Sequence, residues 1–232
     1  MKRINDIFYS IQGEGHNTGR AAVFIRFAGC NLRCGFCDTE FDTYREMTDE
    51  EIIAEVSRYK VSRCEVRGKA TGRRAELGNA RCENSLVVLT GGEPTLQADE
   101  AFVDLLHQHG FEVAMESNGT RPAPQNLDWL TVSPKIRGTS YEVRGTRIPD
   151  ELKVIFDEDT NPEAYLAPLI PELCSPTRSL SSHLAPRYLY LQPCDTGDPE
   201  RNAMIINRCV DYIKEHPQWR LSLQTHKLVG FK

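Results

Sequence analysis

Residues 26–39 read Arg26-Phe-Ala-Gly-Cys-Asn-Leu-Arg-Cys-Gly-Phe-Cys-Asp-Thr39. Within this stretch Cys30, Cys34 and Cys37 stand in a C-x3-C-x2-C spacing, directly after an apolar strand pattern. The intervals between the thiols are too short for another strand, so the thiols should curl around a common centre. Clustered thiolates bind soft metals. Zinc and iron–sulfur clusters generally take four protein ligands, and no fourth Cys or His follows within a few residues. The spacing therefore predicts a metal centre with one open coordination position.

An alternative stays open for this stretch. A structural zinc site that takes its fourth ligand from a distant Cys or His would show the same local spacing. The remaining cysteines are scattered along the chain, which is unlike a disulfide framework.

Length and charge limit the class of protein. With 232 residues, we expect a single domain over 1–232, with loop inserts at 61–84 and about 172–186. A net charge of −5 gives no overall basic field, so we expect no direct nucleic-acid binding. There is no long apolar run for a membrane span, and the first residues lack the apolar core of a signal peptide. We therefore expect a cytoplasmic protein without membrane association, in which thiols stay reduced.

Strand and helix patterns alternate along the chain. Strands are predicted at 4–11, 21–27, 85–89, 111–115, 129–132, 151–156, 188–192 and 220–223, and helices at 48–60, 96–109, 161–170 and 200–216. Thr48 and Glu51 form a capping box, and Gly110 is a predicted helix C-cap. This alternation predicts an α/β fold with a parallel sheet. A Rossmann fold is disfavoured because no G-x-G-x-x-G follows the first strand.

Polar residues recur where the predicted strands end. They are Cys30, Thr90, Glu116, Ser133, Gln192 and Gln224. Ligand sites of parallel α/β sheets and barrels lie at the carboxyl ends of the strands. We therefore expect these side chains to face a single pocket.

The three-cysteine spacing, with the aromatic Phe36 before the third cysteine, resembles the radical S-adenosylmethionine (SAM) superfamily. The resemblance implies a [4Fe–4S] cluster whose fourth iron binds the amino and carboxylate groups of SAM. One electron from an external reductant, of flavodoxin or ferredoxin type, then cleaves SAM to a 5′-deoxyadenosyl radical.

A closer resemblance covers nearly the whole chain. Its blocks, in order, are QGEG at 12–15, RFAGCNL at 26–32, CDT at 37–39, TGGEP at 90–94, ESNG at 116–119, VSPK at 132–135, ELK at 151–153, LQP at 191–193 and WRLSLQTHK at 219–227. Together they resemble the 7-carboxy-7-deazaguanine synthase family. The implied fold is an α/β shortened radical SAM partial (β/α) barrel, and the family is typically homodimeric. The implied reaction is that of a carbon–nitrogen lyase. It converts 6-carboxy-5,6,7,8-tetrahydropterin to 7-carboxy-7-deazaguanine with loss of ammonia, in queuosine and other 7-deazapurine biosynthesis.

The resemblance also implies roles for individual residues. Cys30, Cys34 and Cys37 would hold the [4Fe–4S] cluster, and the hydroxyl of Thr39 would bind Mg2+. The SAM contacts would be Phe36, Cys37, Asp38, Gly92, Glu116, Ser133, Pro134, Lys135, Gln192, Pro193, Cys194 and Asp195. The substrate contacts would be Ile11, Gln12, Gly13, Glu14, Arg26, Thr90 and Lys232. No acid–base residue is assigned as catalytic, because the radical overcomes the barrier to hydrogen abstraction.

Several points stay open in the sequence. Glu116 fits either the SAM ribose or the substrate, and Lys232 differs from the small or apolar residue that often ends related chains. The thiol of Cys194 and the ring of His226 are more simply structural. The Arg-rich insert 61–84 is more simply a solvated loop than a patch for a polyanion. Two other functions remain in view, another radical SAM enzyme such as a glycyl-radical activase and a non-catalytic zinc-binding module.

Overall fold

The computed structural model describes residues 1–37, 43–59, 86–135, 147–166 and 185–231. The insert predicted at 61–84 lies outside these ranges, as do Asp38, Thr39 and Lys232, and only residues 185 and 186 of the second insert lie inside them. Among the helices of the described ranges, none combines the length and the apolarity that crossing a bilayer requires.

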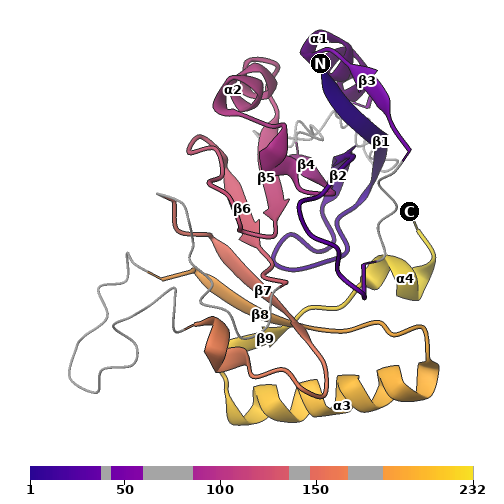
Figure 1. Cartoon of the computed structure of the whole chain (residues 1–232), viewed down its shortest axis with the longest axis vertical. Helices are drawn as coiled ribbons and strands as arrows, with labels where there is room; N and C mark the ends of the chain where they lie inside the picture. The colour runs from indigo at the N-terminus through magenta and orange to yellow at the C-terminus, as the bar shows by residue number, and fades with distance from the viewer. Residues whose placement is uncertain (38–42, 60–85, 136–146, 167–184, 232) are drawn as a thin grey trace, which may run out of the picture.

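A single curved sheet forms the centre of this mixed α/β fold (Figure 1). Its strand order is β3-β1-β2-β4-β5-β6-β7-β8-β9. The strands are β1 (Lys2–Ile11), β2 (Ala21–Phe27), β3 (Arg45–Met47), β4 (Leu86–Gly91), β5 (Glu112–Ser117), β6 (Trp129–Val132), β7 (Glu151–Phe156), β8 (Tyr188–Pro193) and β9 (Trp219–Leu221). From β2 to β9 every neighbouring pair is parallel, as predicted. Within the described residues β3 and β9 are the two edges, so the sheet is a partial barrel that does not close.

The sheet departs from the predicted parallel pairing at its first edge. β1 pairs antiparallel with β2, because the tight 12–20 connection returns the chain directly alongside it. The three-residue β3 then pairs antiparallel with β1.

Helices cover the convex side of the sheet (Figure 1). They are α1 (Asp49–Ser57), α2 (Glu100–Gln108) and α3 (Pro199–Glu215), and the short α4 (Thr225–Val229) lies beside the turn that follows β1. The capping box of Thr48 and Glu51 is confirmed at the start of α1. The helix predicted at 96–109 begins only at Glu100, because Asp99 caps it after a 3-10 turn at Pro94–Leu96. In the described part of 161–170 the predicted helix is a 3-10 turn at Pro162–Tyr165.

Side chains that alternate along the strands separate two faces. On β2, Val23, Ile25 and Phe27 join the buried core beneath the helices, and the same alternation holds on the other parallel strands. α1, α2 and α3 contribute Ile52, Phe102, Leu106 and Ile205, among others, to this core. The opposite, concave face carries a smaller apolar cluster of Ala22, Leu86, Val88 and Ala114. Polar side chains that follow these residues along their strands therefore point into the concavity.

Leu106 of α2 is fully buried in the core and provides a test of this packing. We expect Leu106→Ala to lower the free energy of unfolding by about 2–5 kcal/mol, because it removes buried methyl groups and leaves a cavity. Leu96→Ala is the control, since Leu96 is 36% exposed, and it should cost less than about 0.5 kcal/mol. Urea denaturation followed by circular dichroism measures both. Equal losses in the two variants would contradict the placement of α2.

Candidate active site

The concave face holds a cavity of about 610 Å³ at the carboxyl ends of the parallel strands. Most of the residues predicted for the site line it, namely Ile11, Gln12, Gly13, Glu14, Arg26, Cys30, Cys34, Phe36, Cys37, Thr90, Gly92, Glu116, Ser133, Lys135, Gln192, Pro193, Cys194 and Asp195. Pro134 is buried between Ser133 and Lys135 and does not line the cavity. Asp38, Thr39 and Lys232 lie outside the described residues.

Strand register explains why these residues meet. Arg26 of β2 pairs with Thr90 of β4, and Gln192 of β8 pairs with Ile155 of β7. Arg26, Thr90 and Gln192 each follow apolar or aromatic residues of the concave face by steps of two along their strands. The cavity is therefore lined by the last inward-facing residue of strand after strand.

The loop that follows β2 carries the three cysteines along one side of the cavity. The amide N–H of Leu32 donates to Cys30 Sγ at 3.4 Å, and Asn118 Nδ2 lies 3.9 Å from the same sulfur. Asn118 also donates to Asn31 Oδ1 at 3.0 Å, which ties the loop to the end of β5. No three Cys, His, Asp or Glu side chains of the described residues stand close enough to share one metal ion. A cubane cluster does not require this, because each of its thiolates binds a separate iron.

The donor set of this loop suits a metal that stabilises thiolates. Burial raises the pKa of the Cys34 thiol; the charge of Lys135 opposes this effect, and Cys37 and Cys30 add to it. A bound metal cluster reverses that balance, because a coordinating thiol is deprotonated outright. Three thiols on one loop beside a ligand-sized cavity thus fit the cluster that the spacing predicts.

The TGGEP segment is hydrogen-bonded to the backbone just before the first cysteine. Gly92 N–H donates to Phe27 O at 2.8 Å, and Glu93 N–H donates to Gly29 O at 2.9 Å. A Cβ at Gly92 would lie only 1.9 Å from Gly29 O, so no side chain fits there. The fully buried Glu93 carboxylate accepts hydrogen bonds from Ser117 Oγ at 2.8 Å and from the Asn118 amide at 2.7 Å. The sequence analysis gave Glu93 no role; the structure shows that it fixes the loop to β5.

The QGEG turn is held by residues that follow β9. The Thr225 hydroxyl donates to Gly13 O at 3.0 Å, and Gln224 Nε2 donates to Glu14 Oε1 at 3.0 Å. Gly15 has a φ of 62°, and its N–H donates to Ser222 Oγ at 3.0 Å. This explains why the WRLSLQTHK block accompanies QGEG: the two segments form one wall of the cavity.

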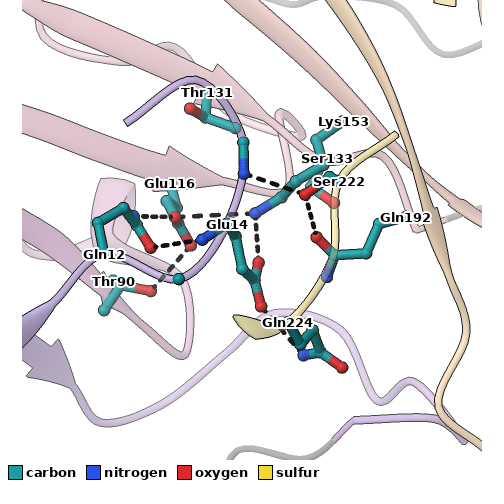
Figure 2. Close-up of polar contacts among 12 residues, drawn as sticks. Gln12, Glu14, Thr90, Glu116, Thr131, Ser133, Lys153, Gln192, Ser222 and Gln224 are labelled. Carbon is teal, nitrogen blue, oxygen red and sulfur yellow. Dashed lines mark hydrogen bonds and ion pairs between the residues drawn. The ribbon is translucent and has the colours of Figure 1, made fainter. Parts of the chain in front are cut away.

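A lysine missed by the sequence analysis lies at the centre of that wall (Figure 2). Lys153 of β7 has a side chain only 4% exposed; its Nζ donates to Glu14 Oε2 at 2.5 Å and lies 3.7 Å from Glu116 Oε1. Gln12 Nε2 donates to Glu116 Oε1 at 2.9 Å, and Thr90 Oγ1 lies 3.5 Å from Glu116 Oε2. The contacts of Glu116 with Gln12 and Thr90 place it beside the residues predicted for the substrate. The alternation of ELKVIF, with Leu152 and Val154 in the core, was the signal that could have identified Lys153.

These neighbours set the charges in the wall. Burial would raise the pKa of Glu14, but the charge of Lys153 and the hydrogen bonds that Glu14 accepts lower it to about 2. The pKa of Lys153 is raised because the Glu116, Glu14 and Glu151 carboxylates outweigh its burial. Lys135 donates to Ser133 Oγ at 2.8 Å, and burial lowers its pKa. Glu14 is therefore an ionised acceptor at neutral pH.

Arg26 lies on the other side of the cavity. Its guanidinium carbon is 5.0 Å from the centroid of the Phe8 ring, which stacks on Phe24 at 5.1 Å. In the described part of the chain no carboxylate forms an ion pair with Arg26. The guanidinium thus faces the cavity as a cation, and its planar fork suits a carboxylate.

Asp195 and His226 line the cavity near its rim. Asp195 Oδ2 accepts a hydrogen bond from Lys227 Nζ at 2.9 Å, and this bond, with others, lowers its pKa to about 2. The His226 ring packs edge-on against Phe231. The Asp195 side chain thus joins the 193–197 loop to α4. His226, which belongs to α4, lies next to Gly13 of the QGEG turn, and this fits the structural role expected for it.

Gly92 and Gly35 provide a matched test of the cysteine loop. We expect Gly92→Ala to reduce bound iron severalfold after reconstitution and to destabilise the fold by about 1–3 kcal/mol, because the new Cβ displaces Gly29. Gly35→Ala, in the cysteine loop itself, meets no atom within 4 Å and should keep its iron. Iron analysis and thermal unfolding check both variants. Full iron content in the Gly92 variant would contradict the close contact.

Glu151 at the start of β7 should make stability depend on pH. Burial raises its pKa to about 7, against an unfolded value of 4.5. Its carboxyl therefore favours the folded state at acid pH, and this contribution is lost as pH rises from about 4.5 to 7. The free energy of unfolding of Glu151→Gln should equal that of wild type near pH 4.5 and exceed it by up to about 3 kcal/mol at pH 8. Urea denaturation across that range measures the difference, and parallel pH curves would contradict it.

The chain is similar to known proteins along its whole length. No protein-family model matches the chain. Among curated proteins, 7-carboxy-7-deazaguanine synthase of Bacteroides thetaiotaomicron is 40% identical over 232 residues, which is the whole of both chains. The enzyme of the same name from Bordetella pertussis is 40% identical over 239 aligned positions, covering 98% of this chain and 97% of the relative.

A solved structure has the same fold. The crystal structure of QueE from Escherichia coli superposes with a TM-score of 0.59 at 25% identity, and the match covers 96% of this chain and 93% of that one. With a relative 40% identical over its full length and a radical SAM fold to match, the chain belongs to the 7-carboxy-7-deazaguanine synthase family.

Proposed function

We propose that this protein is a radical SAM lyase that converts 6-carboxy-5,6,7,8-tetrahydropterin to 7-carboxy-7-deazaguanine and ammonia. The observation that carries the proposal is the composition of one cavity. It is lined by three cysteines of a single loop, by Arg26, which has no carboxylate partner among the described residues, and by the acceptors Glu14 and Glu116 around Lys153. The cysteines suit an iron–sulfur cluster, Arg26 suits a substrate carboxylate, and the acceptors suit the edge of a ring that presents N–H groups.

The residues of the chain would act mainly by positioning. When bound to Cys30, Cys34 and Cys37, the cluster would supply the electron that cleaves SAM to the radical that takes hydrogen from C6 of the pterin. Ser133, Lys135 and the 192–195 segment line the cavity where SAM would lie. Gly92 lies directly behind the cysteine loop, and its position fits the methionine end of SAM.

Arg26 and the acidic wall would orient the pterin. Arg26 would form a forked ion pair with the substrate carboxylate. Glu14 and Glu116 would accept hydrogen bonds from the amino-pyrimidine edge, with Gln12 and Thr90 beside them. We therefore assign Glu116 to the substrate rather than to the ribose. The hydrogen taken from C6 would return after ring contraction, which would regenerate SAM.

Several further features belong to the same proposal. We infer that Mg2+ binds with the help of Thr39, because a hard cation suits a hydroxyl and substrate oxygens. We also infer a homodimer, a single domain over the whole chain, a flavodoxin- or ferredoxin-type reductant and a cytoplasmic location, where the cluster thiols stay reduced.

Product formation tests the function directly. Anaerobic reconstitution with iron and sulfide, followed by SAM, a one-electron reductant, Mg2+ and 6-carboxytetrahydropterin, should yield a deazapurine that mass spectrometry detects. A reconstituted, SAM-cleaving protein that makes no deazapurine would overturn the substrate assignment.

Cys34→Ala tests the cluster assignment. We expect it to abolish the visible absorbance of the cluster and SAM cleavage together, because one iron loses its thiolate. Cys194→Ser is the matched control: Cys194 also lines the cavity, but we expect its variant to keep the absorbance. Ultraviolet–visible spectra and 5′-deoxyadenosine assays measure both. A Cys34 variant that retains both signals would rule out the assignment.

A further inference from the structure

Lys153 is buried between two carboxylates of the cavity wall (Figure 2). Lysine is almost never fully buried unless it is paired, because removing its charge from water is costly. Here Nζ lies 2.5 Å from Glu14 Oε2 and 3.7 Å from Glu116 Oε1. The ammonium thus joins the turn after β1 to the end of β5, from the middle of β7.

The two acids are otherwise contacted by neutral donors. Gln224 donates to Glu14, and Gln12 and Thr90 contact Glu116. A carboxylate that is removed from water keeps its charge only if a cation or several hydrogen-bond donors lie beside it. Lys153 supplies that charge to Glu14, and the low pKa of Glu14 agrees with this role.

The charge of each side chain in the wall decides whether it can accept hydrogen bonds from a pterin. The amino-pyrimidine edge presents N–H donors, so it needs acceptors. An ionised carboxylate only accepts hydrogen bonds, whereas a protonated carboxyl also presents an O–H donor. Arg26 lies on β2, four places along the sheet from the strand β7 that carries Lys153.

We propose that Lys153 is a positioning residue that keeps Glu14 ionised and holds Glu116 beside it as a second acceptor, and so directs the amino-pyrimidine edge of the substrate to these two acids and its carboxylate to Arg26. This inference rests on the proposed function. It adds a residue that determines specificity without touching the reacting atoms.

Lys153→Met tests the inference, because methionine has a similar length and no charge. Anaerobic calorimetry on the reconstituted, SAM-bound protein should show a Kd for 6-carboxytetrahydropterin weakened about 10- to 100-fold at pH 7. The loss should grow toward pH 6 and shrink toward pH 9. Without the cation, burial raises the pKa of Glu14, so the acceptor is protonated at the lower pH.

Other titrating groups surround Glu14 and must be separated from it. Glu116, Lys135, Glu151 and His226 all lie around the QGEG turn, and Glu151 has a pKa of about 7. The decisive comparison is therefore the pH dependence of the Kd in Lys153→Met and in the double variant Lys153→Met/Glu14→Gln. Both variants keep those four groups, so a difference between them comes from Glu14. The double variant should lose the added pH dependence and should cost less than the sum of its single changes.

A second comparison uses the charge-neutral double variant and does not need the single lysine variant to fold. Since Lys153 also holds Glu116, the double variant should bind the pterin more weakly than Glu14→Gln alone. Lys2→Met is the control for loss of a lysine that forms an ion pair. The Nζ atom of Lys2 lies 2.6 Å from Asp49 Oδ1, and neither residue lines the cavity. This variant should lower stability and leave the Kd and its pH profile unchanged.

Discrimination between ring edges is the third readout. The analogue with a 2-oxo group in place of the 2-amino group presents an acceptor to Glu14. Wild type should bind this analogue far more weakly than the pterin. In Lys153→Met the ratio of the two Kd values should be smaller. A wild-type Kd, pH profile and discrimination in the lysine variants would overturn the inference. Failure of wild type to form product would instead overturn the proposed function, while these binding comparisons would still decide the role of Lys153.

Discussion

The strict alternation of side chains along a parallel sheet is the constraint on which this structure depends. One face must bury Val, Ile, Leu and Phe beneath α1, α2 and α3, so every second residue is committed to the core. The remaining residues point into the concavity, where Arg26, Thr90, Glu116, Lys153 and Gln192 end up in one cavity. A shift of one residue in any strand would exchange an apolar core residue for a polar site residue. Stability and ligand binding are therefore encoded in the same register.

Buried polar groups then connect the strand ends to each other. Glu93 joins the TGGEP segment to β5 and supports the cysteine loop through Gly29, while Lys153 joins β7 to the QGEG turn and β5. Each of these buried polar side chains has specific hydrogen-bond or ion-pair partners, as burial in a low-dielectric interior requires. The loss of one partner would therefore leave a buried polar group unpaired. Such networks hold the walls of the cavity in place before any ligand arrives.

Much of the fold followed from local sequence signals. The capping box at Thr48 and the apolar runs of β2, β4 and β7 gave element positions within a few residues, and the polar strand ends predicted the location of the cavity. β3 was missed because three residues, Arg45–Met47, carry no readable period. The antiparallel β1 was missed because pairing direction depends on the connection and not on the strand itself. Lys153 was missed because its importance comes from Glu14 and Glu116, which are far away in sequence. The roles of Cys30, Cys34 and Cys37 as ligands stay predictions.

The contact between the QGEG turn and residues 222–225 has a consequence for biosynthesis. One wall of the cavity is encoded near the beginning of the chain, and the groups that brace it, Ser222, Gln224 and Thr225, are made about 210 residues later, as the span from Glu14 to Gln224 shows. A nascent chain on the ribosome can pair most of its sheet and present its cysteines while this wall is still open. The cavity can therefore be completed only after residue 225 has been made. Radical chemistry then begins only after most of the fold that supports the cavity exists.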